Sequence, residues 1–265
     1  MLTNLIYLKV SVWDHFTISW GISSGDFVNG IQQLPQNIIL INDDFASSNS
    51  YNPHSQFPTI VGQSQIREYL IGPNGNPNKW IDYQTKDHLD SLRDDEIADL
   101  LYLAHIGWPN HQRSPFSHKL GNQFVYLGGR NGFKKIYFQR FTAFTHVLEL
   151  SIKRHLRNQR NSKRIFARPL FVKDLESDLL QQLIETSFTG LILAFELARE
   201  SQRQFKIPIL APKANQEKVL WNTEGQLRSQ TDQLGTLTYN TLTNKWSLQL
   251  QHSQEVDLNN FKIDK

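Results

Sequence analysis

Apolar and polar residues alternate near the start of the chain, which is the pattern of half-buried β-strands. Apolar residues take every second position between residues 5 and 12, and again between residues 15 and 22. Residues 13–15 then form the turn between two strands. Residues 37–44 begin with an apolar run and end in acids, which predicts a buried strand with an exposed polar end.

Apolar residues spaced three or four apart predict three main helices. The first covers residues 94–105, where Asp94 can cap the helix and acids follow in the first turn. The second runs from about 142 to 158, with Leu148, Ile152 and Leu156 as its apolar stripe. The third and longest covers residues 177–199 and contains Gly190, at a cost of roughly 1 kcal/mol relative to Ala.

A hairpin is predicted over residues 124–138, because Asn131-Gly132 is typical of a type I′ turn. This turn pairs Leu127 with Ile136 and Tyr126 with Tyr137. One face then carries Val125, Leu127, Ile136 and Phe138, and the other carries Phe124, Tyr126, Lys135 and Tyr137. A second hairpin is predicted over residues 235–250, where apolar residues alternate on both sides of a polar turn.

Together these elements predict an α+β fold with antiparallel sheet elements, three main helices and a β-rich C-terminal lobe. We expect a main domain over residues 1–205. Residues 206–265 form the lobe, either as a subdomain or as part of the same domain.

Composition narrows the class of protein. The 265 residues are 39% hydrophobic and 20% charged, which is ordinary for a globular chain. There is no cysteine, which excludes a disulfide scaffold, a thiolate metal site and a cysteine nucleophile. The N-terminal apolar run has no basic region before it, and we interpret it as a strand rather than a signal peptide. We therefore expect a cytoplasmic protein without a membrane span.

The net charge of +3 conceals an uneven distribution. Between Lys134 and Lys173 there are eleven Lys or Arg residues and one acid, a local charge of +10, so the other residues sum to −7. A basic band on an acidic body predicts a polyanionic partner or an internal electrostatic match.

The centre of this band falls on the second helix and suggests a nucleic-acid-binding face. The candidate residues are Lys153, Arg154, Arg157, Arg160 and Arg164, extended on the first hairpin by Lys134 and Lys135. Such a row can meet successive phosphates, and Phe124, Tyr126 and Tyr137 would stack bases beside it. The alternative is a solvated face or internal ion pairing, with the aromatic residues filling a second buried face.

A second cluster suggests metal chemistry. Asp95, Asp99, His105 and His111 offer the carboxylate and imidazole ligands that divalent metals use. The spacing matches no known metal-binding motif, since no two histidines lie four residues apart. Acids in the first turn of a helix often only complement the helix dipole. No cofactor is required by the sequence, and no Walker A or dinucleotide-binding glycine motif occurs.

Three hypotheses follow. The first is an accessory protein that binds nucleic acid or another polyanion through the basic helix. The second is a metal-dependent, nuclease-like hydrolase that uses the histidine and aspartate cluster. The third is a structural protein without catalytic activity, whose basic band docks on an acidic surface of its own or of a partner. The oligomeric state is open in all three.

Overall fold

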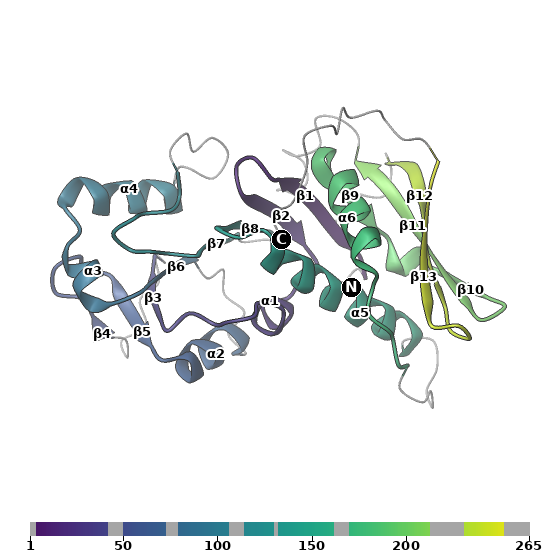
Figure 1. Cartoon of the computed structure of the whole chain (residues 1–265), viewed down its shortest axis with the longest axis horizontal. Coiled ribbons are helices and arrows are strands. Elements are labelled where there is room, and N and C mark those ends of the chain that lie inside the picture. The colour runs from purple at the N-terminus through teal and green to yellow at the C-terminus, as the bar shows by residue number, and fades with distance from the viewer. Residues whose placement is uncertain are drawn as a thin grey trace. The chain divides into compact units, whose positions relative to one another are not determined.

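The computed structural model describes residues 4–41, 50–72, 79–105, 114–129, 132–161, 170–212 and 231–251 (Figure 1). The chain divides into two compact units. Unit 1 consists of Met1–Val10, Ser19–Ile22 and Thr145–Lys265, and unit 2 consists of Ser11–Ile18 and Ser23–Phe144.

The described residues contain six α-helices, of which five have seven or more residues, where the sequence predicted three main ones. The helices are α1 (Ser24–Gly30), α2 (Gln63–Ile71), α3 (Lys86–Asp90), α4 (Asp94–His105), α5 (Thr142–Asn161) and α6 (Ser177–Thr186), with two 3-10 turns, η1 (Ser187–Thr189) and η2 (Phe195–Leu197). The strands are β1 (Ile6–Ser11), β2 (Phe16–Trp20), β3 (Asn37–Leu40), β4 (Ser50–Tyr51), β5 (Pro58–Val61), β6 (Lys79–Tyr83), β7 (Phe124–Gly128), β8 (Lys134–Phe138), β9 (Leu191–Leu193), β10 (Arg199–Ser201), β11 (Gln204–Pro212), β12 (Thr231–Asn240) and β13 (Lys245–Leu250). The predicted α+β class is confirmed.

Unit 2 is built around an antiparallel sheet with the strand order β2-β8-β7-β6-β3-β5-β4. Helices α3 and α4 cover one face, where Leu89 and Leu100 pack in one core cluster with Ile81. Helix α1 covers the other face, where the Phe27 ring contacts four aromatic rings, among them that of Trp80. Because both faces are covered, the central strands are buried on both sides.

The hairpin of β7 and β8 forms as predicted, but its register differs by one residue. Tyr126 lies opposite Ile136, and Val125 opposite Tyr137. The amide of Gly129 donates to the carbonyl of Phe133 at 2.7 Å, and Gly132 has a φ of +77°. The connection therefore has three residues rather than two, with glycine in the left-handed position, and the face assignment changes with it.

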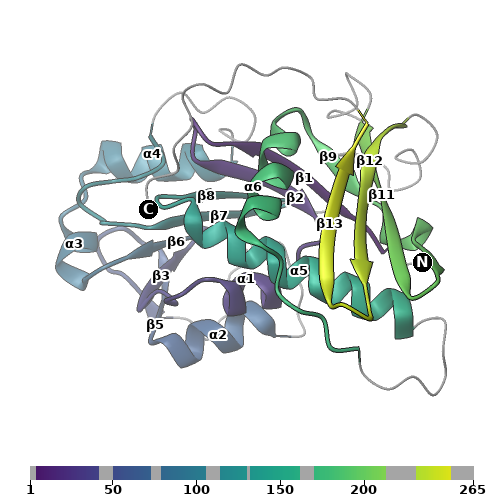
Figure 2. The same ribbon diagram turned by 45° about the vertical axis from the view of Figure 1, so that its right-hand side comes forward.

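Unit 1 contains the antiparallel order β13-β12-β11-β9-β1, with β10 paired to the other end of β11. Figure 2 shows β11, β12 and β13 side by side. The predicted hairpin of residues 235–250 is confirmed as β12 and β13. Strands from both sides of residue 205 pair within this sheet, since β9 lies between β1 and β11.

The predicted helix over residues 177–199 is wrong beyond Thr186. Gly190 has a φ of +94° and follows the 3-10 turn η1, so the chain leaves the helical conformation there. The next three residues form β9, which is fully buried between two strands. A short apolar run of this kind fits a buried strand as well as a helix, and periodicity does not separate the two.

None of the described helices is long and apolar enough to cross a membrane.

The replacement Gly190→Ala tests this assignment. A φ of +94° is costly for an L-residue, and the added Cβ would lie 3.0 Å from Cγ of Pro212. We expect the free energy of unfolding to fall by about 2 kcal/mol in urea denaturation. The matched variant Gly25→Ala, in α1, places its Cβ no closer than 3.6 Å to another atom and should be neutral or stabilising. A stabilising Gly190→Ala would instead indicate a helical residue 190.

Candidate nucleic-acid interface

Helix α5 lies with one side in the core of unit 1. The predicted stripe is confirmed, because Leu148, Ile152 and Leu156 are at most 1% exposed. Three polar residues of this helix, Ser151, His155 and Gln159, are buried as well. The buried side is therefore wider than the apolar stripe, and only the opposite side of the helix is left for exposed cations.

The ammonium group of Lys153 is engaged inside the unit. It forms an ion pair with Asp174 and lies 3.9 Å from a carboxylate oxygen of Glu149. Lys153 holds the pKa of Asp174 below its usual range, whereas burial raises the pKa of Glu149. The first cation of the predicted row is thus paired with carboxylates of its own unit.

Arg154 points into the protein rather than toward solvent. Its Nη2 atom donates to the backbone carbonyl of Gly21 at 2.6 Å. The neighbouring His155 lies against the same carbonyl, with Nε2 at 2.7 Å, and its Nδ1 is 2.5 Å from Oδ1 of Asn4. Arg154 therefore contributes to a buried hydrogen-bond network and offers little of its charge to a ligand.

Arg157 and Arg160 are the two cations of the predicted row that remain. Arg157 is exposed and Arg160 is partly exposed. Within the described part of the chain, neither takes part in an ion pair or a hydrogen bond through its side chain. Arg164 lies outside the described residues.

The segment that leads to α6 runs antiparallel to α5. The amide of Leu175 donates to Glu149, and Asp174 pairs with Lys153 one helical turn further on. The segment therefore meets α5 at two successive turns, those of Glu149 and Lys153.

Hydrogen bonds to the C-terminal hairpin hold this segment in place. The amide of Lys173 donates to the hydroxyl of Tyr239 at 3.3 Å, and Nε1 of Trp246 donates to the carbonyl of Lys173 at 2.9 Å. The Tyr239 hydroxyl also lies 3.2 Å from the carbonyl oxygen of Phe171. The side chain of Lys173 is exposed, and Phe171 is 75% exposed.

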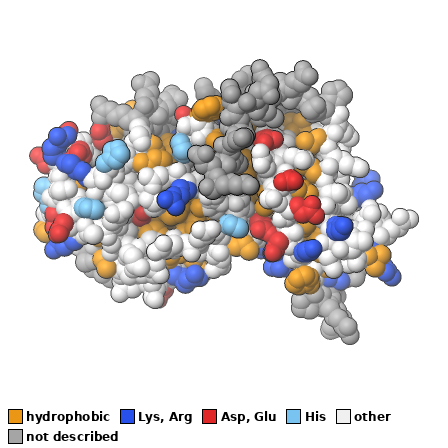
Figure 3. Space-filling view, viewed as in Figure 1, with side chains coloured by type: hydrophobic (Ala, Val, Ile, Leu, Met, Phe, Trp, Pro, Cys, Tyr) orange, Lys and Arg blue, Asp and Glu red, His pale blue; other side chains and the backbone are white. Residues whose placement is uncertain are grey.

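We call Arg157, Arg160, Lys173 and Phe171 the α5-end surface. It combines three cations with one exposed aromatic ring on a single unit. In Figure 3, Lys and Arg side chains lie beside hydrophobic ones at the lower right, and acidic side chains gather above them. The sequence did not predict the exposure of Phe171, because the residue lies in an irregular segment where hydrophobic periodicity does not assign a buried or exposed side.

The candidates on the first hairpin belong to unit 2, and Lys135 is not on the surface. Lys135 is 3% exposed, and its Nζ atom lies 4.3 Å from the ring centre of Phe16 and 4.8 Å from that of Tyr137. Burial lowers the pKa of Lys135 to about 8, and the charge of Asp14 acts in the opposite direction. Lys134 is partly exposed.

The aromatic residues expected to stack bases are also in the core. Phe124, Tyr126 and Tyr137 are at most 8% exposed, and Tyr126 is stacked on Trp80 at 5.3 Å. Their predicted role as a stacking surface is wrong, because helices cover both faces of this sheet. The alternative interpretation, a second buried face, is the correct one.

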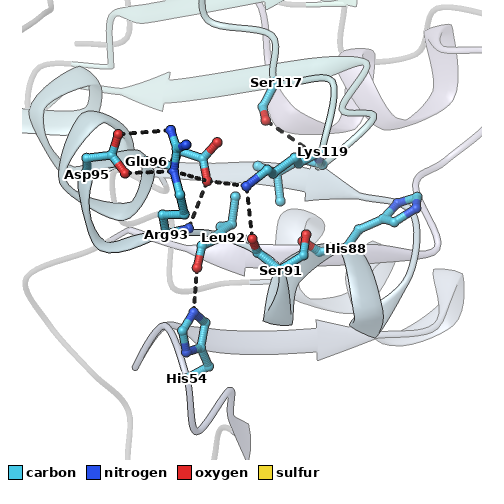
Figure 4. Close-up of polar contacts among 10 residues, drawn as sticks. His54, His88, Ser91, Leu92, Arg93, Asp95, Glu96, Ser117 and Lys119 are labelled. Carbon is cyan, nitrogen blue, oxygen red and sulfur yellow. Dashed lines mark hydrogen bonds and ion pairs between the residues drawn. The ribbon is translucent and has the colours of Figure 1, made fainter.

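The structure describes the side chains of two of the four predicted metal ligands, Asp95 and Asp99. Asp95 accepts two hydrogen bonds from the Arg93 guanidinium, at 3.0 and 3.1 Å. Glu96 binds Lys119 at 2.7 Å, and Figure 4 shows these four residues in one network at the start of α4. His105 lies at the end of α4, with no side-chain position described, and His111 lies outside the described residues.

Asp99 is an exposed residue of α4. No group of three histidine, aspartate or glutamate side chains in the described ranges could hold a metal ion. The first turn of α4 carries three acids, Asp94, Asp95 and Glu96, and carboxylates in this position complement the helix dipole.

A serine near the start of α1 also has a structural role. Residues 21–25 read GISSG, which fits the G-x-S-x-G form of a nucleophile elbow. Ser23 has a φ of −81° and caps α1, with its Oγ accepting from the amide of Asp26 and the Asp26 carboxylate accepting from the amide of Ser23. In the described chain no histidine hydrogen-bonds to Ser23, so the pattern encodes a capping box.

Comparison with known protein families, with curated proteins and with solved structures finds no match to this chain.

The most perturbed carboxyl group in the described chain is that of Asp82, in β6. Asp82 is 5% exposed and accepts the backbone amides of Gln123 and Phe124, at 2.6 to 3.1 Å. Burial raises its pKa to about 6, although these hydrogen bonds act in the opposite direction. Asp82 therefore anchors the start of β7 through these hydrogen bonds.

The pKa of Asp82 predicts how stability changes with pH. The folded chain holds this proton up to about pH 6, whereas the unfolded chain releases it near 3.8. Folding is therefore favoured by the protonated form, and this contribution of about 3 kcal/mol is lost as the pH rises between these values. Asp82→Asn has no proton to release at this position. Its free energy of unfolding relative to wild type should therefore increase as the pH rises from 3.8 to about 6. Urea denaturation at a series of pH values measures it, and parallel curves would contradict the prediction.

Proposed function

We propose that the protein is a non-catalytic accessory protein that binds nucleic acid through the α5-end surface. The observation that carries this proposal is that Arg157 is exposed and Arg160 partly exposed, with no side-chain partner among the described residues, while Lys173 of the same unit is exposed as well. Three other cations of the predicted row, Lys153, Arg154 and Lys135, are engaged within the protein, and we leave them out of the interface.

The chemistry of the exposed cations favours phosphate as their ligand. Arg157 and Arg160 lie three positions apart on a helix, so their side chains emerge on neighbouring positions about 5–6 Å apart at Cβ. A guanidinium group donates two parallel hydrogen bonds to a phosphate, and it stays charged at all physiological pH values. Two such groups beside a lysine suit a chain of successive phosphates better than a single carboxylate.

Charge pairing inside the unit supports the third hypothesis in one respect. Lys153, a cation of the basic band, pairs with Asp174 and Glu149 of the same unit. Arg157 and Arg160 also lie in the last turns of α5, where cations are favoured by the helix dipole without any ligand. A protein whose band is purely structural would bind no polyanion, and the experiment below separates the two cases.

The test is fluorescence anisotropy with labelled DNA and RNA over a salt series. We expect wild type to bind at low salt with an affinity that falls as salt rises. Arg157→Gln with Arg160→Gln should remove two phosphate contacts and reduce the slope of log K against log salt by about 1.4 for single strands, or about 1.8 for a duplex. Absence of binding at low salt, or an unchanged slope in the variant, would overturn the proposal.

Two control variants make the result specific to this surface. Arg67→Gln with Lys86→Gln removes two exposed cations of unit 2 and should leave the slope unchanged. Lys153→Met removes a cation of α5 that is already paired, so it should lower stability and leave the slope unchanged. Heparin that binds as tightly as nucleic acid, with the same dependence on Arg157, would argue for a general polyanion site instead.

A further inference from the structure

The exposed ring of Phe171 lacks an explanation in the fold of unit 1. Its two neighbours in the apolar pattern of the segment, Val172 and Leu175, are buried at 2% and 6% exposure, whereas Phe171 is 75% exposed. Leaving a phenylalanine side chain in water forfeits about 1.5–3 kcal/mol of burial free energy. The ring of Phe171 therefore adds little to the stability of unit 1 and is accessible to a ligand.

The backbone beneath this ring is held firmly. The carbonyl of Phe171 lies against the hydroxyl of Tyr239, which is itself fully buried and packed on Trp246 at 4.6 Å between ring centres. The next residue but one, Lys173, bonds the hairpin through both its amide and its carbonyl. The Phe171 ring is thus presented from an anchored segment, which reduces the entropy lost when a ligand packs on it.

The chemistry around the ring selects the ligand. A phenyl ring has no hydrogen-bonding atom, so what it offers is a flat apolar face. Lys173, two positions along the segment, is exposed like Phe171, whereas Val172 between them is buried. A cation on the same side of the segment as the ring suits a ligand that pairs flat apolar groups with a phosphate chain. Nucleic-acid bases meet this description, and their faces are free only where the strand is unpaired, because a duplex stacks them on one another.

We propose that Phe171 is a base-stacking platform and that the ligand is therefore single-stranded nucleic acid. This inference rests on the proposed function, since the arginines supply the phosphate contacts and Phe171 supplies the base contact. Stacking is tolerant of sequence, because every base has a π-face. The site accordingly distinguishes unpaired strands from duplexes and reads little sequence.

The experiment compares three labelled ligands of one sequence: a single strand, the same strand with abasic sites throughout, and a blunt duplex. Wild type should bind the single strand at least tenfold more tightly than either of the others. Phe171→Leu, which keeps an apolar side chain without the ring, should weaken single-strand binding about tenfold, and Phe171→Trp should retain it. The salt slope should stay the same in both variants, because no phosphate contact changes.

A matched control is Trp13→Leu, which removes an exposed aromatic side chain of unit 2 that is 76% exposed and should change no affinity. Thermal unfolding verifies that each variant keeps its fold, as the exposure of Phe171 leads us to expect. The abasic strand provides an internal check, since its affinity should not respond to Phe171→Leu.

The outcomes separate this inference from the function on which it rests. Salt-dependent binding that requires Arg157 and Arg160 but is unaffected by Phe171→Leu would overturn the stacking platform and leave the nucleic-acid interface standing. Equal affinity for duplex and single strand would do the same. Absence of binding to all three ligands would overturn both. Binding to anionic lipid vesicles that is lost in Phe171→Leu, without nucleic-acid binding, would assign the ring to a membrane surface instead.

Discussion

The burial of α5 in the core of unit 1 is the constraint on which the candidate surface depends. The helix buries its predicted stripe together with Ser151, His155 and Gln159, so about half of its circumference is closed to solvent. A cation on such a helix reaches water only from the remaining strip. Position relative to Ile152 and Leu156, rather than the number of charges, therefore decides which arginines are free to act.

Local charge is for this reason a poor measure of available charge. The band from Lys134 to Lys173 carries +10 in the sequence, but the described structure uses its members in different ways. The ammonium group of Lys135 lies over two aromatic rings. Lys153 forms ion pairs with two carboxylates, and Arg154 donates a hydrogen bond to a backbone carbonyl. A buried or paired cation stabilises its neighbours, whereas an unpaired, solvated one contributes to the field that a phosphate would meet.

The accuracy of sequence prediction varied with the kind of signal. The helix of residues 94–105 was located because its acidic first turn marks the start and its apolar face marks the body; Asp94, predicted as the cap, is instead its first residue. The β7–β8 register was missed by one residue, because the dipeptide at the tip predicts a turn but not the length of the loop. The region after Thr186 was missed because a fully buried strand has no polar side to create alternation.

The same reasoning explains why base-stacking residues were sought in the wrong place. Alternation in β7 and β8 cannot show that helices cover both faces of a sheet, and both faces there are buried. An exposed ring in an irregular segment leaves no periodic trace, so Phe171 became visible only through its accessibility.

The C-terminal hairpin supplies no residue of the α5-end surface, but its hydrogen bonds fix the backbone that carries Phe171 and Lys173. The buried Tyr239 ring brings one hydroxyl to the segment between α5 and α6, and Trp246 adds a second hydrogen bond two positions away from Phe171. Ion pairing with α5 fixes the other end of the same segment at Asp174. The segment is thereby held between a helix that carries arginines and a hairpin that carries hydrogen bonds. A base platform and a phosphate contact require fixed separation, and two anchors of different chemistry provide it where a single ion pair, screened by salt, would not.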